Sequence, residues 1–89
     1  MTVRGGIKAG KISKPYGLQG KVYLILDPFV ANNIRQGDPL FIEIDGQRVP
    51  YFTETFEQIS GEQALVKFEF IDSIGEARKL TGCIVYLDP

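Results

Sequence analysis

The sequence predicts a mostly β fold: a six-stranded, closed or nearly closed antiparallel β-barrel with one short helix before the last strand. Three observations lead to this prediction. Short segments rich in β-branched and aromatic residues recur along the 89-residue chain, glycine and proline turns separate them, and one late segment carries helix-capping chemistry instead. Because closure removes exposed sheet edges, we favour a barrel, with a two-sheet sandwich as the alternative.

The first predicted strand covers Val3 to Ser13 and contains glycines that let the chain bend. The second, Lys21 to Leu26, is apolar on both faces, which is typical of a central or covered strand. Asp27-Pro28 ends it, because proline has no N–H to donate to a neighbouring strand. Residues 29–36 then form a connection that can include a helical turn.

Three strands follow in the middle of the chain. In Leu40 to Ile44, the even-numbered residues are expected to face one way and Phe41 and Glu43 the other. This strand runs directly into Asp45-Gly46, the strongest short hairpin motif. Gln47 to Phe56 is the return strand, and its Pro50 indicates an edge or a bulge. Ala64 to Phe68 is the next strand, with its even-numbered residues expected to face one side.

The helix is predicted from Ser73 and Glu76, which have the spacing of a capping box. Gly82 is well placed to end it in the left-handed conformation. Ile84 to Leu87 is the last strand. We therefore expect one domain over residues 1–89, and its end directly after this strand suggests a domain cut from a longer protein.

The amino-acid composition excludes most kinds of catalytic and metal-binding site. The chain has one cysteine and no histidine, so a Cys-His or Ser-His pair, a histidine-containing zinc site and a thiolate cluster are all impossible. The carboxylates fall mainly at turns or at outward-facing strand positions, where we expect them to be solvated. We predict no enzyme activity, no catalytic residue, no metal, no cofactor and no small-molecule substrate. Cys83 is expected to be a small buried core residue.

No apolar run approaches the length needed to cross a bilayer, and the N-terminal residues lack the apolar stretch of a secretory signal. We therefore expect a cytoplasmic protein without membrane contact.

The net charge is −1, but its distribution is uneven: five of the ten basic residues precede Asp27, and all eleven acidic residues lie at or after it. This asymmetry predicts a face that attracts phosphate or an acidic protein surface. Considered by itself, the uneven charge distribution is explained equally well by ordinary lysines that are exposed to solvent on strands.

The basic residues surround a glycine-containing turn, which we identify as the candidate binding site. A strand follows the turn, whereas a nucleotide phosphate loop requires a helix there. Gly17 and Gly20 are expected to shape the turn, and Leu18 to anchor it or offer an apolar contact. Tyr16 is expected to be exposed beside Pro15. The predicted binding residues are Lys14, Tyr16, Gly17, Leu18, Gln19, Gly20 and Lys21, and Lys8 and Lys11 extend the basic face.

These segments resemble the N-terminal domain of the RimM family of ribosome maturation factors. The turn motif of that family corresponds to residues 10–22, Gly-Lys-Ile-Ser-Lys-Pro-Tyr-Gly-Leu-Gln-Gly-Lys-Val. A second motif corresponds to residues 65–72, Leu-Val-Lys-Phe-Glu-Phe-Ile-Asp, and the family's helix and turn correspond to Glu76-Ala77 and Leu80-Thr81-Gly82. Two departures stand out: Tyr16 replaces the usual histidine, and the family's second barrel domain is absent from this chain.

The resemblance implies a six-stranded barrel like the second domain of translation GTPases. It also implies a non-enzymatic assembly factor that binds the immature small ribosomal subunit, assists rRNA processing and helps the head of the subunit to mature. The expected partner is a ribosomal protein of the head, its rRNA, or both, bound by a monomer. The alternative is a structural barrel that positions a neighbouring domain and binds no ligand itself.

Overall fold

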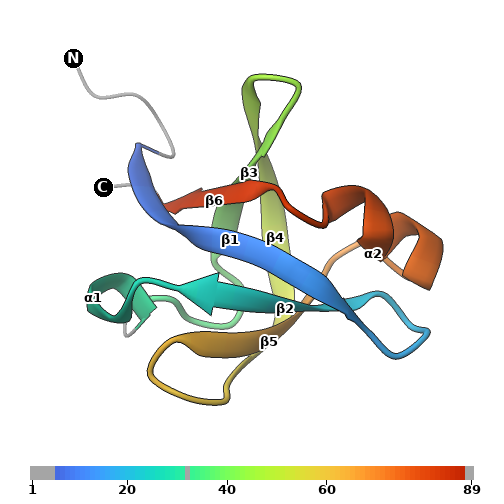
Figure 1. Ribbon diagram of the computed structural model, residues 1–89, viewed down its shortest axis with the longest axis horizontal. Helices are drawn as coiled ribbons and strands as arrows, with labels where there is room; N and C mark the ends of the chain where they lie inside the picture. The colour runs from blue at the N-terminus through green and yellow to red at the C-terminus, as the bar shows by residue number, and fades with distance from the viewer. Residues whose placement is uncertain (1–5, 32, 88–89) are drawn as a thin grey trace.

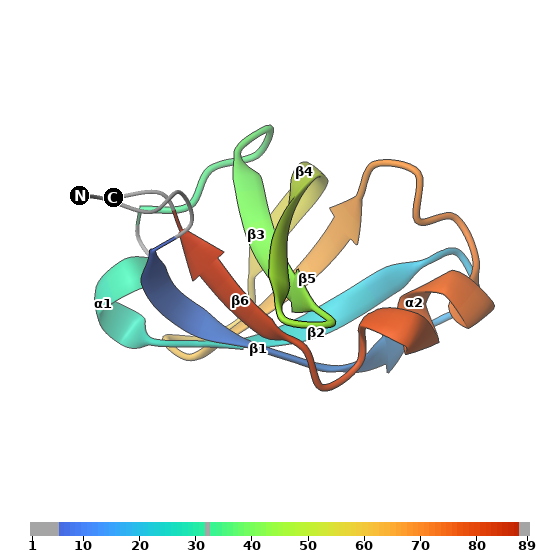
Figure 2. The same ribbon diagram turned by 90° about the horizontal axis from the view of Figure 1, so that it is seen from above.

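The computed structural model describes residues 6–31 and 33–87, and within these residues six antiparallel strands close into a barrel (Figure 1). Around the barrel the strands follow the order β1-β2-β5-β4-β3-β6. Figure 2 shows the two short helices at opposite ends of the molecule. The predicted barrel is therefore confirmed, and the sandwich alternative is wrong. The elements are β1 (Ile7–Tyr16), β2 (Lys21–Leu26), α1 (Pro28–Ala31), β3 (Pro39–Ile44), β4 (Gln47–Gln58), β5 (Gln63–Phe68), α2 (Ile74–Leu80) and β6 (Ile84–Leu87).

Strand β1 extends three residues past its predicted end at Ser13, and the predicted start at Val3 lies outside the described residues. The extension depends on a bulge. Ile12 pairs with Leu24 of β2, but Lys14 pairs with Tyr23, so one extra residue is inserted into β1 between them. A bulge lets a strand keep pairing while it bends, so β1 remains paired with β2 as far as Tyr16.

Strand β2 is central, as predicted, because β1 and β5 flank it. It is not covered on both faces. Val22, Leu24 and Leu26 are buried, but Ile25 on the opposite face is 50% exposed. The outer face of β2 therefore remains available for contacts.

Strands β3 and β4 form the hairpin predicted from Asp45-Gly46, with Ile44 paired to Gln47. Both turn residues have positive φ, 51° and 79°, as the favoured two-residue hairpin turn requires. Strand β4 changes partner along its length: residues 47–52 pair with β3 and residues 53–58 with β5. Pro50 lies in the half that pairs with β3 only, in agreement with the predicted edge position.

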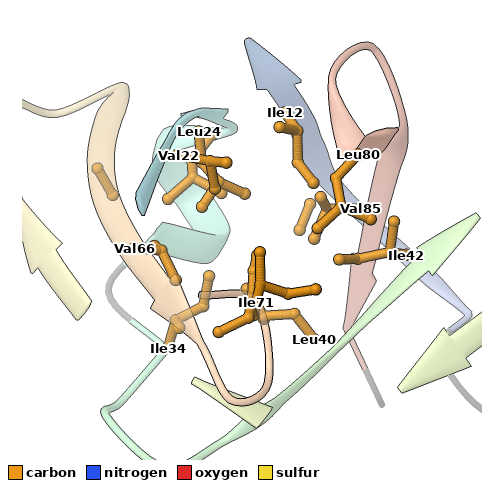
Figure 3. Close-up of a cluster of buried hydrophobic side chains, with 14 of the residues drawn as sticks. Ile12, Val22, Leu24, Ile34, Leu40, Ile42, Val66, Ile71, Leu80 and Val85 are labelled. Carbon is orange, nitrogen blue, oxygen red and sulfur yellow. The ribbon is translucent and has the colours of Figure 1, made fainter. Parts of the chain in front are cut away.

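The core fills the barrel with apolar side chains from every strand and from α2 (Figure 3). The even-numbered residues of β5, Ala64, Val66 and Phe68, share the inner side of the strand, and all three are fully buried. Leu40 and Ile42 of β3 belong to the same buried cluster. Burial of apolar surface, at about 25 cal/mol per Å², is the main force that holds the scaffold together.

Helix α2 begins and ends as its capping residues predict. The Ser73 Oγ accepts a hydrogen bond from the Glu76 N–H at 3.2 Å. The Glu76 carboxylate reaches back to the Asp72 N–H at 3.4 Å, one residue before the position that a capping box uses. Gly82 follows the helix with φ of 86°, which satisfies the left-handed requirement at this site.

Candidate functional site

The predicted binding residues lie on the β1–β2 hairpin, and the bulge in β1 determines which of them share a face. Lys14 is directly opposite Tyr23, and Tyr16 is directly opposite Lys21. Since Val22 and Leu24 point into the core, their neighbours Lys21 and Tyr23 point outward. We call the surface formed by Lys14, Tyr16, Lys21 and Tyr23 the hairpin face.

The hairpin face is ordered by contacts between its own side chains. The rings of Tyr16 and Tyr23 meet edge to face, with centroids 5.3 Å apart and an interplanar angle of 87°. The Lys14 ammonium lies 5.5 Å from the centroid of the Tyr23 ring, within cation–π range. These contacts leave Tyr16 47% exposed, as predicted. Two cations and two aromatic rings are therefore presented together on one surface.

The turn continues this surface beyond the ends of the strands. Leu18 is 76% exposed, and Gly17 and Gln19 are also exposed. Tyr16, Gly17, Leu18, Gln19 and Lys21 line a shallow depression. A Cβ atom added at Gly17 would meet no atom within 4 Å, so this glycine is required only by its φ of 66°.

Gly20 has a different role, because it is buried where the turn rests on the connection between β5 and α2. A Cβ atom at this position would lie 2.0 Å from the Ile71 carbonyl oxygen, and φ is 100°. Only glycine allows the two backbones to approach this closely. Gly20 therefore cannot contact a partner directly, but it fixes the orientation of the exposed turn.

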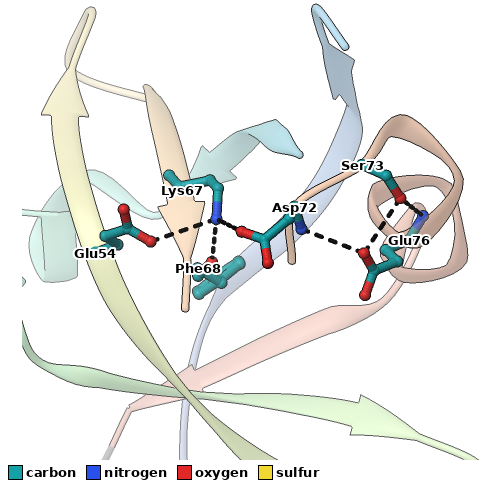
Figure 4. A network of polar contacts seen from close by, with 6 residues as sticks. All are labelled: Glu54, Lys67, Phe68, Asp72, Ser73 and Glu76. Carbon is teal, nitrogen blue, oxygen red and sulfur yellow. Dashed lines mark hydrogen bonds and ion pairs between the residues drawn. The ribbon is translucent and has the colours of Figure 1, made fainter. Parts of the chain in front are cut away.

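The connection that supports Gly20 is held by a buried lysine (Figure 4). The Lys67 ammonium donates to Asp72 at 2.9 Å, to Glu54 at 3.4 Å and to the Phe68 carbonyl at 2.9 Å. Burial alone would lower the pKa of Lys67, but the hydrogen bonds to Asp72 and Glu54 outweigh it and raise the pKa above its ordinary value. Glu54 and Asp72 are therefore ion-pair partners as well as solvent-facing carboxylates.

Lys8 and Lys11 are both exposed on β1. Lys11 pairs with Ile25, so it extends the hairpin face along the same two strands. Lys8 pairs instead with Tyr86 of β6 and lies further round the barrel. No carboxylate occurs between residue 6 and residue 26. A positive potential therefore extends along β1 and into the turn.

Two contributors were not predicted from the sequence. Tyr23 was not among the predicted binding residues, although its alternation with buried Val22 and Leu24 places it on the outer face. Lys67 lies between buried Val66 and Phe68 and is itself 9% exposed, because the carboxylates of Glu54 and Asp72 satisfy its charge. Its alternation with these core residues predicts an outward-facing lysine, so nothing in the pattern indicates its burial.

The remaining predictions concern chemistry elsewhere in the chain. Cys83 is partly buried against the core, and burial raises the pKa of its thiol. Among residues 6–31 and 33–87, no three histidine, cysteine or acidic side chains are grouped to hold a metal ion. None of the helices in this part of the chain is long and apolar enough to span a membrane.

Comparisons with known proteins agree on one family. A model described as the RimM N-terminal domain matches residues 7–89. The ribosome maturation factor RimM of Parabacteroides distasonis is 34% identical over 80 residues, which are 89% of this chain and 45% of that protein. RimM of Flavobacterium psychrophilum is 31% identical over 78 residues, which cover 88% of this chain and 45% of that protein.

A solved structure is similar to this chain and points to the same family. The crystal structure of a protein from Pseudomonas aeruginosa, described as the 16S ribosomal RNA processing protein RimM, superposes with a TM-score of 0.71 and 25% sequence identity. The superposition covers 89% of this chain and 48% of that one. The chain therefore spans about half the length of the relatives that it matches.

Proposed function

This chain belongs to the RimM N-terminal domain family, and we propose that it is a non-enzymatic ribosome-assembly module that binds the immature small ribosomal subunit. In this proposal the hairpin face and its turn form the contact surface. The module assists rRNA processing and maturation of the head of the subunit. It acts in the cytoplasm, as a monomer, and contacts rRNA, a ribosomal protein of the head, or both.

One observation carries the proposal: the positive, aromatic surface of the hairpin is exposed, and contacts between its own side chains hold it in place. Tyr16 and Tyr23 are already packed together, and Lys14 already lies near the Tyr23 ring. Pre-ordered side chains lose little conformational entropy on binding, so more of the contact energy becomes affinity.

The chemistry of the surface suits rRNA. Lys14 and Lys21 can neutralise phosphates, and the release of counterions makes such contacts dependent on salt. Tyr16 can stack on an unpaired base, because every base offers a π face. Leu18 and Gln19 add an apolar contact and an amide at the tip of the turn. Tyr16 stands where the family usually has a histidine, and its ring and hydroxyl can still stack and form hydrogen bonds.

The proposal is tested by co-sedimentation of the chain with immature small subunits over a range of salt concentrations. The double variant K14E/K21E should bind more weakly. If each lysine contacts one phosphate, the slope of log K against log salt should fall by about 1.4–1.8 in magnitude. The control is R78E/K79E, which reverses the same number of charges at exposed positions on α2 and should bind as the parent chain does.

Equal binding by the parent chain and K14E/K21E would contradict the proposed contact surface. It would favour the alternative, in which the barrel positions a neighbouring domain and the hairpin is only structural. Equal loss in both double variants would instead show that binding responds to net charge and has no defined site.

A further inference from the structure

A second exposed surface lies apart from the hairpin face, where β4 meets the residues that follow β5. Phe52 is 48% exposed and Phe70 is 83% exposed. A groove with mostly apolar walls includes both rings, and its lining residues are Val49, Pro50, Tyr51, Phe52, Glu69 and Phe70. We call this surface the aromatic groove.

Phe70 is held outward by a backbone conformation that disfavours its own side chain. Its φ is 68°, a value rare for residues other than glycine and an outlier for a bulky aromatic residue. Residues kept in such conformations cluster at functional sites. A glycine would satisfy this backbone more easily, so folding alone does not explain a phenylalanine here.

The walls of the aromatic groove are fixed by the barrel. The Glu69 N–H donates to the Phe52 carbonyl at 2.9 Å, and the Ile71 N–H donates to the Phe68 carbonyl at 3.3 Å. These bonds tie the segment that carries Phe70 to β4 and to the end of β5. The half of β4 that lines the groove pairs with β3 only, but Pro50 has no N–H, which disfavours the addition of another strand at this edge. A partner would therefore be recognised by side chains.

The charge around the aromatic groove is negative. Glu69 is the only charged residue among the described residues that line it. Two further carboxylates, Glu54 and Asp72, lie two residues along the chain from Phe52 and Phe70. Their side chains are 55% and 73% exposed, and they share one buried cation, Lys67. The potential here is opposite in sign to that of the hairpin face, so a polyanion such as RNA would be repelled.

We propose that the aromatic groove binds a lysine- or arginine-rich protein segment that carries an apolar anchor residue. The anchor packs against Phe52 and Phe70, and its flanking cations lie near Glu69, Asp72 and Glu54. Exposed aromatic residues in a concave site are typical anchors of protein–protein contacts. The chain would then contact two chemically different partners, an anion at the hairpin face and a cationic protein at the groove.

The test uses the whole chain and a short fluorescein-labelled peptide of alternating lysine and leucine. Binding is measured by fluorescence anisotropy and located by amide shifts in heteronuclear NMR. The parent chain should bind the peptide with shifts at Phe52, Glu69 and Phe70, and F70G and E69K should each weaken binding by about tenfold. A peptide with glutamate in place of lysine should not bind.

The controls are I59S and E57K, which remove an exposed apolar residue and reverse an exposed charge near the far end of β4, and they should bind as the parent does. Urea unfolding of F70G separates a binding defect from a folding defect, because the glycine should unfold at no lower urea concentration. Unchanged peptide affinity in F70G, equal affinity for the acidic peptide, groove shifts caused by an RNA oligonucleotide, or self-association that buries Phe70 would each overturn the proposal.

Discussion

The close approach of the turn to the β5–α2 connection leads to a prediction with a worked magnitude. Replacement of Gly20 by alanine places a Cβ atom 2.0 Å from the Ile71 carbonyl oxygen at a φ of 100°. The positive φ costs an L-residue about 1–2 kcal/mol, and forcing an extra carbon against packed backbone costs about 1–3 kcal/mol more. We expect G20A to lose about 2–5 kcal/mol of unfolding free energy.

The matched control is Gly17, three residues earlier in the same turn. Its φ is 66°, but a Cβ atom there would meet no atom within 4 Å. Only the conformational cost applies, and alanine recovers part of it by restricting the unfolded chain, so G17A should lose about 1 kcal/mol. The two variants carry the same chemical change and differ in what the new carbon meets.

Urea unfolding followed by far-UV circular dichroism measures both costs, since the chain has no tryptophan to report on its fold. Each kcal/mol corresponds to a shift of about 4–8 °C in Tm for a domain of this size, so a thermal melt gives an independent value. Equal losses in G20A and G17A, or a G20A variant as stable as the parent, would refute the docking of the turn on the connection.

Three further predictions follow from the described contacts. K67M should lose about 1–3 kcal/mol of unfolding free energy, because it removes charge-assisted hydrogen bonds. Since the folded pKa of Lys67 is raised, this contribution is complete below the ordinary lysine pKa of about 10.4 and disappears as pH rises through the folded pKa. Urea unfolding of the parent chain and K67M across that pH range should show the difference in their unfolding free energies decreasing. F70G should keep its stability or gain up to about 1 kcal/mol, because removing the cost of a positive φ at phenylalanine offsets the larger conformational entropy that glycine loses on folding. A clear loss of unfolding free energy in urea would contradict this. Y16A should weaken binding to immature subunits by about 1–3 kcal/mol if Tyr16 stacks on a base, with an unchanged salt slope in co-sedimentation; a change in that slope would point to a lost charge contact instead.

The sequence predicts much of the barrel because its local features agree with one another. The Asp45-Gly46 turn, the Ser73 cap and the alternation of β5 each specify one element without reference to the rest of the chain. The exposure of Tyr16 followed from its place beside the turn. The sequence left open whether the outer face of β2 is covered, because an apolar strand has the same residue pattern in both cases.

Two features of the site depend on contacts between distant segments. Ile12, Lys14 and Tyr16 alternate in step, so a regular strand would place all three on one face. The bulge separates buried Ile12 from exposed Lys14 and Tyr16, and a period-two pattern contains no sign of it. The burial of Lys67 depends in the same way on Glu54 and Asp72, which reach it from another strand and from the connection before α2.

The central claim is that the hairpin face, with its turn, meets the immature small subunit. Site-specific photo-crosslinking tests this most directly, with a benzophenone side chain placed at Leu18, or at Ile59 as a control. Both positions are exposed apolar residues, 76% and 50%, and they lie on different loops. We predict crosslinks to rRNA or to a protein of the subunit from position 18 and none from position 59. Crosslinks from position 59 alone would contradict the claim.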